Sequence, residues 1–331
     1  MGFLKTILMK NLTRLLCVFG LLLSVAFAES LDETRKKAEA GDASAQLRLG
    51  MGYHYTSDVT RDYTEAAKWY RKAADQNNAV AQYNLGQLYR NGEGVPKDYA
   101  EAVKWYRKAA DQGNASAQYN LGFRYENGDG VPKDSTEAMK WYRLAADQGV
   151  AGAQLNLGVM YDIGDGVPKD SAEAVKWYRK AADQGNAKAQ FNLGVMYQNG
   201  EGVPKDSAEA VKWYRKAAEQ GVAGAQFNLG LMYQTGEGVP KDYAEAVKWF
   251  RKSADQGNAF AQVSLGGMYF LGEGVPKDLV QAHVWWNIAG AAGHENAKKN
   301  LAIIEKQMTD SQKEKAMDLA RELFAKLPKK K

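Results

Sequence analysis

The sequence predicts an all-α protein, an α/α right-handed superhelical solenoid of antiparallel helix pairs. The pattern A-x-A-Q-x-x-L-G-x-x-Y recurs every 36 residues, beginning at Ala43 and for the seventh time at Ala259. A tryptophan also recurs once per unit, from Trp69 to Trp285. Seven units of 36 residues therefore extend over 41–292 without an insertion. Stacked copies of a short motif are typical of solenoids, because one helix pair alone cannot bury its apolar face.

Each unit is expected to begin with a helix, as residues 113–148 illustrate. Asn114 is a good N-cap residue, and Ala117 and Leu121 follow it at the spacing of one helical face. Gly122 stands inside this helix at a cost of about 1 kcal/mol relative to alanine. Because the glycine recurs in every unit, we expect it to mark the closest approach of two helix backbones.

The segment G-[ED]-G-V-P-K-D, for example Gly128–Asp134, is expected to turn the chain toward a second helix. Glycines before a lysine at a helix start could also form a phosphate-binding loop. The segment occurs in six units, however, whereas one phosphate loop would suffice. Glycine permits positive φ and proline interrupts a helix, so we interpret the segment as a structural turn with a solvated lysine.

The second helix is expected to begin after Asp134, with Glu137 completing a capping box. Gly149 is expected to end it as a left-handed residue. The residues predicted to be buried on this helix are Ala138, Trp141 or Tyr142, and Ala145.

The N-terminal residues 1–28 resemble a cleavable signal peptide. Three basic residues and no acidic one accompany the apolar run Leu15–Phe27, which ends in Ala26-Phe27-Ala28. We expect cleavage after Ala28 and a periplasmic or secreted protein. The alternatives are an uncleaved anchor, for which the run is short, and lipidation of Cys17, which no small residue precedes.

Capping segments are expected at both ends of the repeats. Residues 29–40 form a short charged segment, and residues 293–331 comprise capping helices and a basic tail. Thr309 is a candidate N-cap for a last amphipathic helix, Gln312–Leu327. We expect the first unit to be looser, because Tyr55–Asp62 replaces its Gly-Pro turn.

Charge and residue usage exclude several classes of function. The formal net charge is +5, of which the first 28 residues carry +3, so the remainder is too balanced to favour nucleic acid. Cys17 is the only cysteine, which leaves no thiol after cleavage. His54, His283 and His294 are too dispersed along an extended stack to share a zinc ion, and His54 is expected at the surface. We therefore expect no enzyme activity, no catalytic residue, no metal, no cofactor and a monomer.

The chain resembles the Sel-one-like repeat (SLR) family, relatives of the tetratricopeptide repeats. The resemblance covers residues 41–292 and lies in A-x-A-Q-x-x-L-G-x-x-Y, then G-x-G-V-x-x-D, then A-x-x-W-[YW]-x-x-A-A. It implies a solenoid that binds other proteins on its inner face, often as an exported adaptor. One secreted branch carries a disulfide in each repeat and has been associated with penicillin-like compounds. This chain departs from that branch, because no repeat contains cysteine and neither S-x-x-K nor K-T-G is present.

A stripe on the first helix of each unit varies, although the packing positions repeat. Its three positions, spaced i, i+4 and i+7, share one helical face. The resemblance places that face in the concave groove, so we expect it to contact a partner. The first position could instead pack between units. The predicted partner-binding residues are Gln87, Arg90, Tyr119, Phe123, Glu126, Val159, Asp162, Val195, Gln198, Leu231 and Gln234, and the first-helix stripe is completed by Tyr83, Leu155, Phe191, Phe227, Val263, Gly267 and Phe270.

A row of asparagines lies beside this stripe. Their amides could bond to the backbone of an extended peptide, or to a neighbouring helix. The row consists of Asn84 and of the predicted binding residues Asn120, Asn156, Asn192 and Asn228.

Together these features predict an exported, non-enzymatic scaffold that binds a protein or peptide in a concave groove. The alternatives are a secreted or surface factor that contacts host molecules and a hydrolase of the penicillin-related branch. Nothing in the sequence separates an envelope role from a host role.

Overall fold

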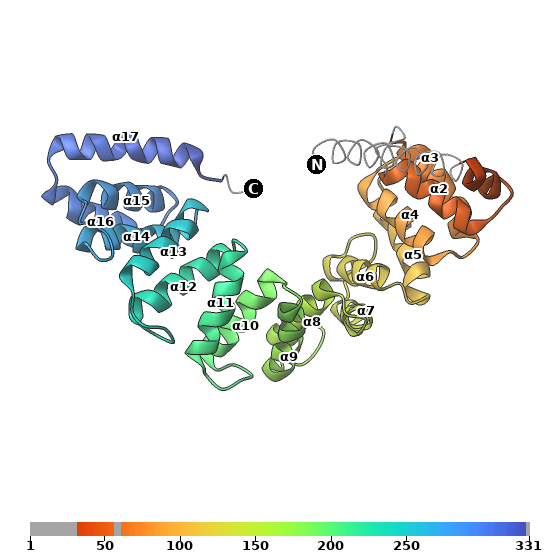
Figure 1. The fold of residues 1–331 in the computed structure, drawn as a ribbon, viewed down its shortest axis with the longest axis horizontal. Helices are drawn as coiled ribbons and strands as arrows, with labels where there is room; N and C mark the ends of the chain where they lie inside the picture. The colour runs from red at the N-terminus through yellow and green to blue at the C-terminus, as the bar shows by residue number, and fades with distance from the viewer. Residues whose placement is uncertain (1–31, 56–60, 329–331) are drawn as a thin grey trace, which may run out of the picture. The chain divides into compact units, whose positions relative to one another are not determined.

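A computed structural model describes residues 32–55 and 61–328, in which every regular element is a helix. The predicted all-α class of paired helices is thus confirmed (Figure 1). The chain divides into two compact units, Met1–Val150 and Ala151–Lys331. The predicted signal peptide and part of the unusual first turn lie outside the described residues. Within those residues, no helix combines the length and the apolar character needed to cross a membrane.

The first unit contains three helix pairs, preceded by helical residues 32–39. Each helix of the pairs has 13 residues, and the second helix of a pair packs against the first. The helices are α2 (Ala43–Tyr55), α3 (Tyr63–Asp75), α4 (Ala79–Asn91), α5 (Tyr99–Asp111), α6 (Ala115–Asn127) and α7 (Ser135–Asp147).

The second unit contains four further pairs and a C-terminal cap. The pairs are α8 (Ala151–Ile163) and α9 (Ser171–Asp183), α10 (Ala187–Asn199) and α11 (Ser207–Glu219), α12 (Ala223–Thr235) and α13 (Tyr243–Asp255), and α14 (Ala259–Leu271) and α15 (Leu279–Ala291). The cap consists of α16 (Glu295–Ile304), the 3₁₀ turn η1 (Glu305–Gln307) and α17 (Asp310–Lys326).

Side-chain caps fix where the helices begin. The Asn114 side chain accepts a hydrogen bond from the backbone N–H of Ala117 at 2.9 Å, and Asp134 accepts one from Glu137 at 2.9 Å. These bonds satisfy backbone donors that have no partner inside the helix. Gly149, with φ +88°, follows the second helix in the left-handed region. The predicted caps and stop are confirmed.

The predicted capping box of the second helices is only half correct. The backbone N–H of Asp134 donates to the carbonyl of Tyr125 on the preceding helix, at 3.0 Å. The Glu137 side chain instead pairs with Lys140 at 2.5 Å. Because the turn already satisfies the Asp134 N–H, the glutamate is available for an ion pair one helical turn further on. A reciprocal capping box does occur at Thr309 and Gln312 of α17.

The glycine inside each first helix makes room for an aromatic ring of the paired helix. The prediction that a close approach of two backbones is the main reason for this glycine is therefore wrong. A Cβ on Gly122 would lie 2.8 Å from the ring of Tyr142 in the paired helix, and 3.1 Å from the carbonyl oxygen of Ala138. Tyr142 is fully buried, as are the predicted core residues Ala138 and Ala145. The ring is recessed into the partner helix, which needs a residue without a side chain there.

The two glycines of each turn have different roles. Gly92 adopts φ +75° after α4, as expected for a left-handed helix end. Gly94 also has positive φ, and a Cβ there would lie 2.1 Å from the carbonyl oxygen of Tyr63 at the start of α3. The second glycine has the same close approach to the preceding repeat in four further turns, at Gly130, Gly202, Gly238 and Gly274.

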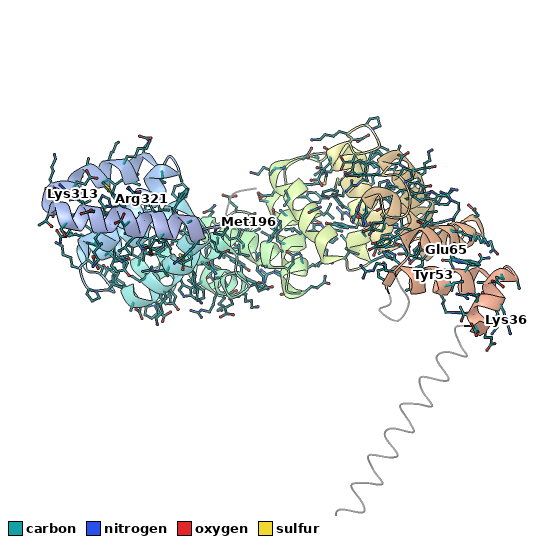
Figure 2. The ribbon with its side chains drawn as sticks, turned by 90° about the horizontal axis from the view of Figure 1, so that it is seen from above. Lys36, Tyr53, Glu65, Met196, Lys313 and Arg321 are labelled. Carbon is teal, nitrogen blue, oxygen red and sulfur yellow. The ribbon has the colours of Figure 1, made fainter. Side chains whose placement is uncertain are left out.

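The C-terminal cap covers α15 with an amphipathic helix. α17 begins at Asp310, two residues before the predicted start, after the expected N-cap Thr309. Its buried face includes Ala316 and Ala320. Ion pairs lie along the helix toward solvent, between Lys313 and Asp310 and between Arg321 and Asp318; Figure 2 labels Lys313 and Arg321. The polar face lies toward water, as predicted.

Candidate functional site

The first-helix stripe lies beside the buried face of each first helix. On α10, the buried residues Ala189, Leu193 and Gly194 face the paired helix α11. Val195 and Gln198 lie next to this face and are half-buried. The stripe therefore lies at the boundary between the core of the helix pair and solvent. Each of its side chains is packed on one side and accessible on the other.

The first, aromatic position of the stripe packs mainly within the repeat. Tyr83 contacts the ring of Tyr106 on the paired helix with centroids 6.0 Å apart, and Phe191 contacts Tyr214 at 5.9 Å. Phe191 also approaches the next repeat, since a Cβ on Gly224 would lie 3.3 Å from its ring. These rings support the repeat and its neighbour while one edge stays half-exposed. Tyr119 and Phe227 have equivalent ring contacts with Tyr142 and Phe250.

The middle position offers most of the apolar surface of the stripe. The Phe123 side chain is 37% exposed and lies against the guanidinium group of Arg124 at 4.9 Å. Val159, Val195 and Leu231 are half-buried and pack against the cores of their own repeats. Gln87 replaces the apolar side chain in α4, where it accepts a hydrogen bond from Tyr106 at 2.8 Å.

The third position supplies acceptors for buried tyrosine hydroxyls. The Tyr214 hydroxyl donates to Gln198 Oε1 at 2.6 Å, and the Tyr178 hydroxyl to Asp162 at 3.4 Å. Glu126 accepts a bond from Tyr142 in the same way. Two residues differ: Gln234 Nε2 lies 3.5 Å from Met268 Sδ, and Arg90 donates to the neighbouring Asn91 side chain at 3.0 Å.

The asparagine row takes part in the same network. Asn192 of α10 and Asn228 of α12 hydrogen-bond to the hydroxyls of Tyr178 and Tyr214, each in the preceding repeat. Asn120 is buried and donates to the Ser116 carbonyl at 3.0 Å. Asn84 is buried as well, whereas Asn156 is half-buried. The amides of Asn120, Asn192 and Asn228 thus have partners inside the protein.

Burial governs the electrostatics of these tyrosines. It raises the pKa of Tyr214 to about 12, with the Asn228 hydrogen bond opposing and the Glu237 carboxylate adding to the rise. Burial likewise raises the pKa of Tyr70, Tyr106 and Tyr178. At neutral pH these buried tyrosines are therefore uncharged phenols, which act as hydrogen-bond donors and not as bases.

The expected surface position of His54 is wrong. Its side chain is only 9% exposed, and its Nδ1 lies 3.2 Å from the hydroxyl of Tyr70. The ring also stacks on Tyr55 with a centroid distance of 3.9 Å. Desolvation by this burial lowers the pKa of His54, while the Glu93 carboxylate opposes the shift and Arg61 adds to it. The end of α2 packs against the paired helix α3, and a linear pattern does not reveal this contact.

His283 is buried too, with Nε2 3.2 Å from Glu305 in η1. Over residues 32–55 and 61–328, no three His, Cys, Asp or Glu side chains gather in a way that could hold a metal ion.

A glutamine ladder joins the repeats and was not anticipated from the sequence. Gln82 is buried in α4, where its Nε2 donates to the Ala74 carbonyl of the preceding repeat at 3.1 Å. Its Oε1 accepts a bond from Gln112 at 2.7 Å. One buried amide thus connects two repeats. The signal was the glutamine in A-x-A-Q, a polar residue that recurs in an otherwise apolar pattern.

Arginines form a second link between repeats. Arg251 of α13 donates to the hydroxyl of Tyr269 in α14 at 2.5 Å and lies 4.9 Å from the ring centroid of Trp285. Arg215 donates to Tyr233 in the same manner at 2.7 Å. At Arg251 a planar cation thus lies between a phenol and an indole, and Arg71 and Arg107 are placed in the same way.

The chain matches known repeat proteins along most of its length. The Sel1 repeat model matches seven consecutive segments: residues 43–78, 79–114, 115–150, 151–186, 187–222, 223–258 and 259–294. The crystal structure of a Sel1 repeat protein from Oxalobacter formigenes is 38% identical, with a TM-score of 0.66 over 84% of this chain and 80% of that one.

Two further solved structures are similar in sequence. The first is c5321, a protective antigen of uropathogenic Escherichia coli strains displaying an SLR fold, which is 31% identical over 89% of this chain and 94% of its own, with a TM-score of 0.46. The second is a putative sel1 repeat protein from Klebsiella pneumoniae, 26% identical over 61% of this chain and 98% of its own, with a TM-score of 0.39. None of the curated proteins compared with the chain matches it. The seven segments cover more than half of the sequence, and the chain therefore belongs to the Sel1 repeat family.

Proposed function

We propose that the chain is an exported, non-enzymatic scaffold that binds a protein or peptide partner along its first-helix stripe. The observation that carries the proposal is the contrast between the two sides of each first helix. The packing side repeats the same alanine, leucine and glycine, whereas the stripe changes from Gln87 to Phe123, Val159, Val195 and Leu231 while remaining partly exposed. Solenoids present such extended surfaces to their partners.

The chemistry of the stripe suits an extended peptide. In the second unit, Val159, Val195 and Leu231 offer apolar contacts at successive repeats. Beside them, Asp162 and Gln198 carry carbonyl or carboxylate oxygens with spare acceptor capacity, because each accepts one tyrosine hydroxyl. Many weak contacts on a rigid surface can sum to useful affinity, since little ordering of the scaffold is needed.

A substitution of the stripe tests this proposal. The triple variant Val159→Ser, Val195→Ser, Leu231→Ser removes the apolar contacts of three repeats. Crosslinking in the native cells, followed by mass spectrometry, identifies a partner. The affinity of that purified partner is then compared between the wild type and the variant, and we expect a loss of at least tenfold with an unchanged helical circular dichroism spectrum.

The control removes apolar side chains that are exposed on other helices. The variant Leu144→Ser, Ile303→Ser changes exposed residues on α7 and α16, and it should bind the partner like the wild type. Equal affinity of the triple variant and the wild type would refute the stripe as the binding surface.

The export and the lack of catalysis belong to the same proposal and have separate tests. Fractionation of cells into periplasm, membrane and medium should place the mature chain in the periplasm or the medium, with its N-terminus at Glu29. A hydrolase screen that includes penicillins should detect no turnover by the purified mature chain. Turnover that copurifies with the protein would contradict the scaffold proposal.

A further inference from the structure

The glutamine ladder follows a fixed rule along the chain. In each repeat where the bond is seen, a glutamine after the second helix donates its Nε2 to the Oε1 of the glutamine 30 residues earlier, at 2.7–2.8 Å. The donors are Gln76, Gln112, Gln148, Gln184, Gln220 and Gln256.

The ladder is interrupted in the seventh repeat. The donor position there is Ala292, which has no amide. Gln262 is nevertheless in place: it is 2% exposed, and its Nε2 donates to the Ala254 carbonyl at 3.1 Å. Among the described residues, no donor is bonded to Gln262 Oε1. The oxygen is not one of the fully buried polar atoms that lack a partner, so it is open to a donor that enters the pocket.

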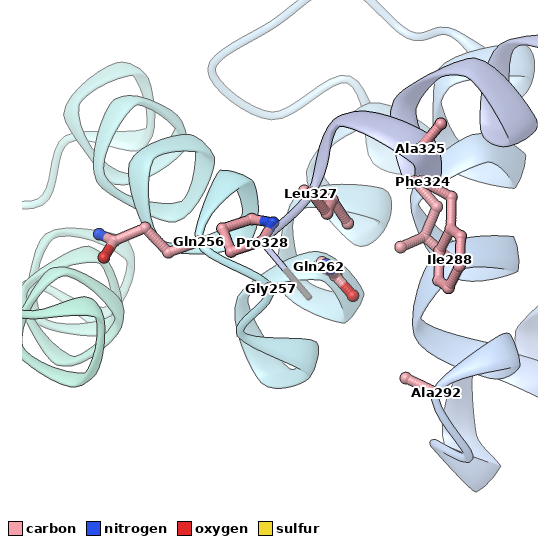
Figure 3. A pocket seen from close by; sticks show the side chains of 9 residues that line it. All are labelled: Gln256, Gly257, Gln262, Ile288, Ala292, Phe324, Ala325, Leu327 and Pro328. Carbon is pink, nitrogen blue, oxygen red and sulfur yellow. The ribbon is translucent and has the colours of Figure 1, made fainter. Parts of the chain in front are cut away.

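A pocket occupies the space that the missing glutamine side chain leaves. Its volume is about 400 Å³, and Gln262 and Ala292 both line it. The apolar walls are Ile288 of α15 and, from the end of α17, Phe324 and Leu327. Figure 3 shows the Gln262 amide between Leu327 and Ala292, with Ile288 and Phe324 on the far side. The α17 cap provides the walls that no preceding repeat has.

We propose that this pocket binds a small, uncharged, apolar molecule that carries one N–H donor. The N–H takes the place of the missing glutamine amide on Gln262 Oε1, and the apolar body lies against Ile288, Phe324 and Leu327. A neutral ligand fits because all nine lining residues are uncharged and an unpaired buried charge is strongly disfavoured. The volume is that of a small-molecule site. The proposal does not depend on the first-helix stripe.

The test uses N-phenyl-1-naphthylamine, a neutral aromatic probe with one N–H whose fluorescence increases in apolar surroundings. Titration of the mature chain should show one saturable site. Ala292→Gln restores the ladder donor and fills the space, so the affinity should fall at least tenfold. Phe324→Ala removes one wall at a residue that is 55% exposed and thus tolerant of change, and it should also weaken binding.

Gln220→Ala is the matched control, because it opens the same gap in the ladder at a repeat that α17 does not cover. It should bind the probe with the wild-type affinity and stoichiometry. The N–H itself is tested with 1-benzylnaphthalene, which has a methylene in its place. Its inhibition constant for displacing the probe should be at least threefold higher than the dissociation constant of the probe. Circular dichroism checks that every variant is folded.

Two results would overturn the proposal: wild-type affinity in folded Ala292→Gln, or an inhibition constant of 1-benzylnaphthalene equal to the dissociation constant of the probe. Neither result bears on partner binding by the stripe, because Ala292→Gln leaves Val159, Val195 and Leu231 unchanged.

Discussion

Two adjacent glycines of α14 have opposite surroundings. A Cβ on Gly266 would lie 2.5 Å from Nε1 of Trp286, the residue that takes the place of the recessed ring in the last repeat. A Cβ on Gly267 would meet nothing within 4 Å. Neither glycine has positive φ. The same residue type is therefore required for space at one position and is merely tolerated at the next.

Alanine at these two positions should change stability in opposite directions. Gly266→Ala forces the Trp286 ring away and disturbs its 3.0 Å hydrogen bond to the Val263 carbonyl, so we expect a loss of about 1–3 kcal/mol in the free energy of unfolding. Gly267→Ala should add about 0.5–1 kcal/mol, because it reduces the backbone freedom of the unfolded chain. Urea unfolding followed by circular dichroism measures both, and equal effects would contradict the packing described.

At the scale of the element, the second helices connect two neighbouring first helices through one tyrosine. Tyr214 of α11 places its ring over Gly194 of α10 and donates its hydroxyl to Gln198 of the same helix. Asn228 of the next first helix, α12, bonds to that hydroxyl. Phe250 at the equivalent place in α13 keeps the ring without the hydroxyl. The ring thus supports the pair, and the hydroxyl links the repeats.

The buried tyrosines should make stability fall in alkaline solution. The unfolded chain ionises its tyrosines near pH 10, whereas burial raises the pKa of Tyr214 to about 12. Because the folded pKa is the higher one, the stabilisation is complete below pH 10 and is lost as the pH rises toward 12. Each such tyrosine contributes a slope of about 1.4 kcal/mol per pH unit.

Tyr214→Phe removes the contribution of one tyrosine to this pH dependence of the free energy of unfolding. Urea unfolding at pH 9, 10 and 11 should show a smaller decrease in the variant than in the wild type, while Phe250 indicates that a ring without hydroxyl is accommodated. An identical pH dependence of the two proteins would mean that Tyr214 ionises freely in the folded state.

At the scale of the whole molecule, neighbouring repeats within each unit contact one another through the same few links. The turn glycine, the ladder glutamine and the bridging arginine recur in the second unit. α9 and α11 differ only at their last residue, Asp183 against Glu219. One repeat can therefore replace another as a neighbour, as expected for a protein whose interactions are nearly one-dimensional.

Deletion of residues 187–222, one whole repeat, should leave a folded protein. The deletion joins Asn186 to Ala223, so that α12 gains an asparagine cap in place of Val222, which makes no side-chain cap bond. We expect the same helical ellipticity per residue as in the full chain and a cooperative urea transition. Deletion of residues 187–204 is the control. It removes one helix of a pair and should lose ellipticity and expose apolar surface. A whole-repeat deletion that unfolds would show that the repeats are not interchangeable.

Residues with a short-range role were predictable, and residues with a distant partner were not. Asn114, Asp134 and Gly149 act on backbone within a few residues, so their identity and position were sufficient. His54 looked like a surface residue, but its environment depends on Tyr70 and Tyr55. Gln82 was visible as a repeated polar residue, yet its donor Gln112 lies 30 residues away. The partner-binding role of the stripe stays a prediction.

The sequence by itself determined the period, the helix pairs, the turns and the family, because each depends on local backbone preferences repeated seven times. Only the tertiary structure decided what fills the space beside the helical glycines, which amides and hydroxyls bond across repeats, and where the C-terminal pocket lies. Those features depend on side chains far apart in the chain that meet only after the helices pack. The space left by the missing glutamine at Ala292 becomes a pocket because residues at the end of α17 line its other side.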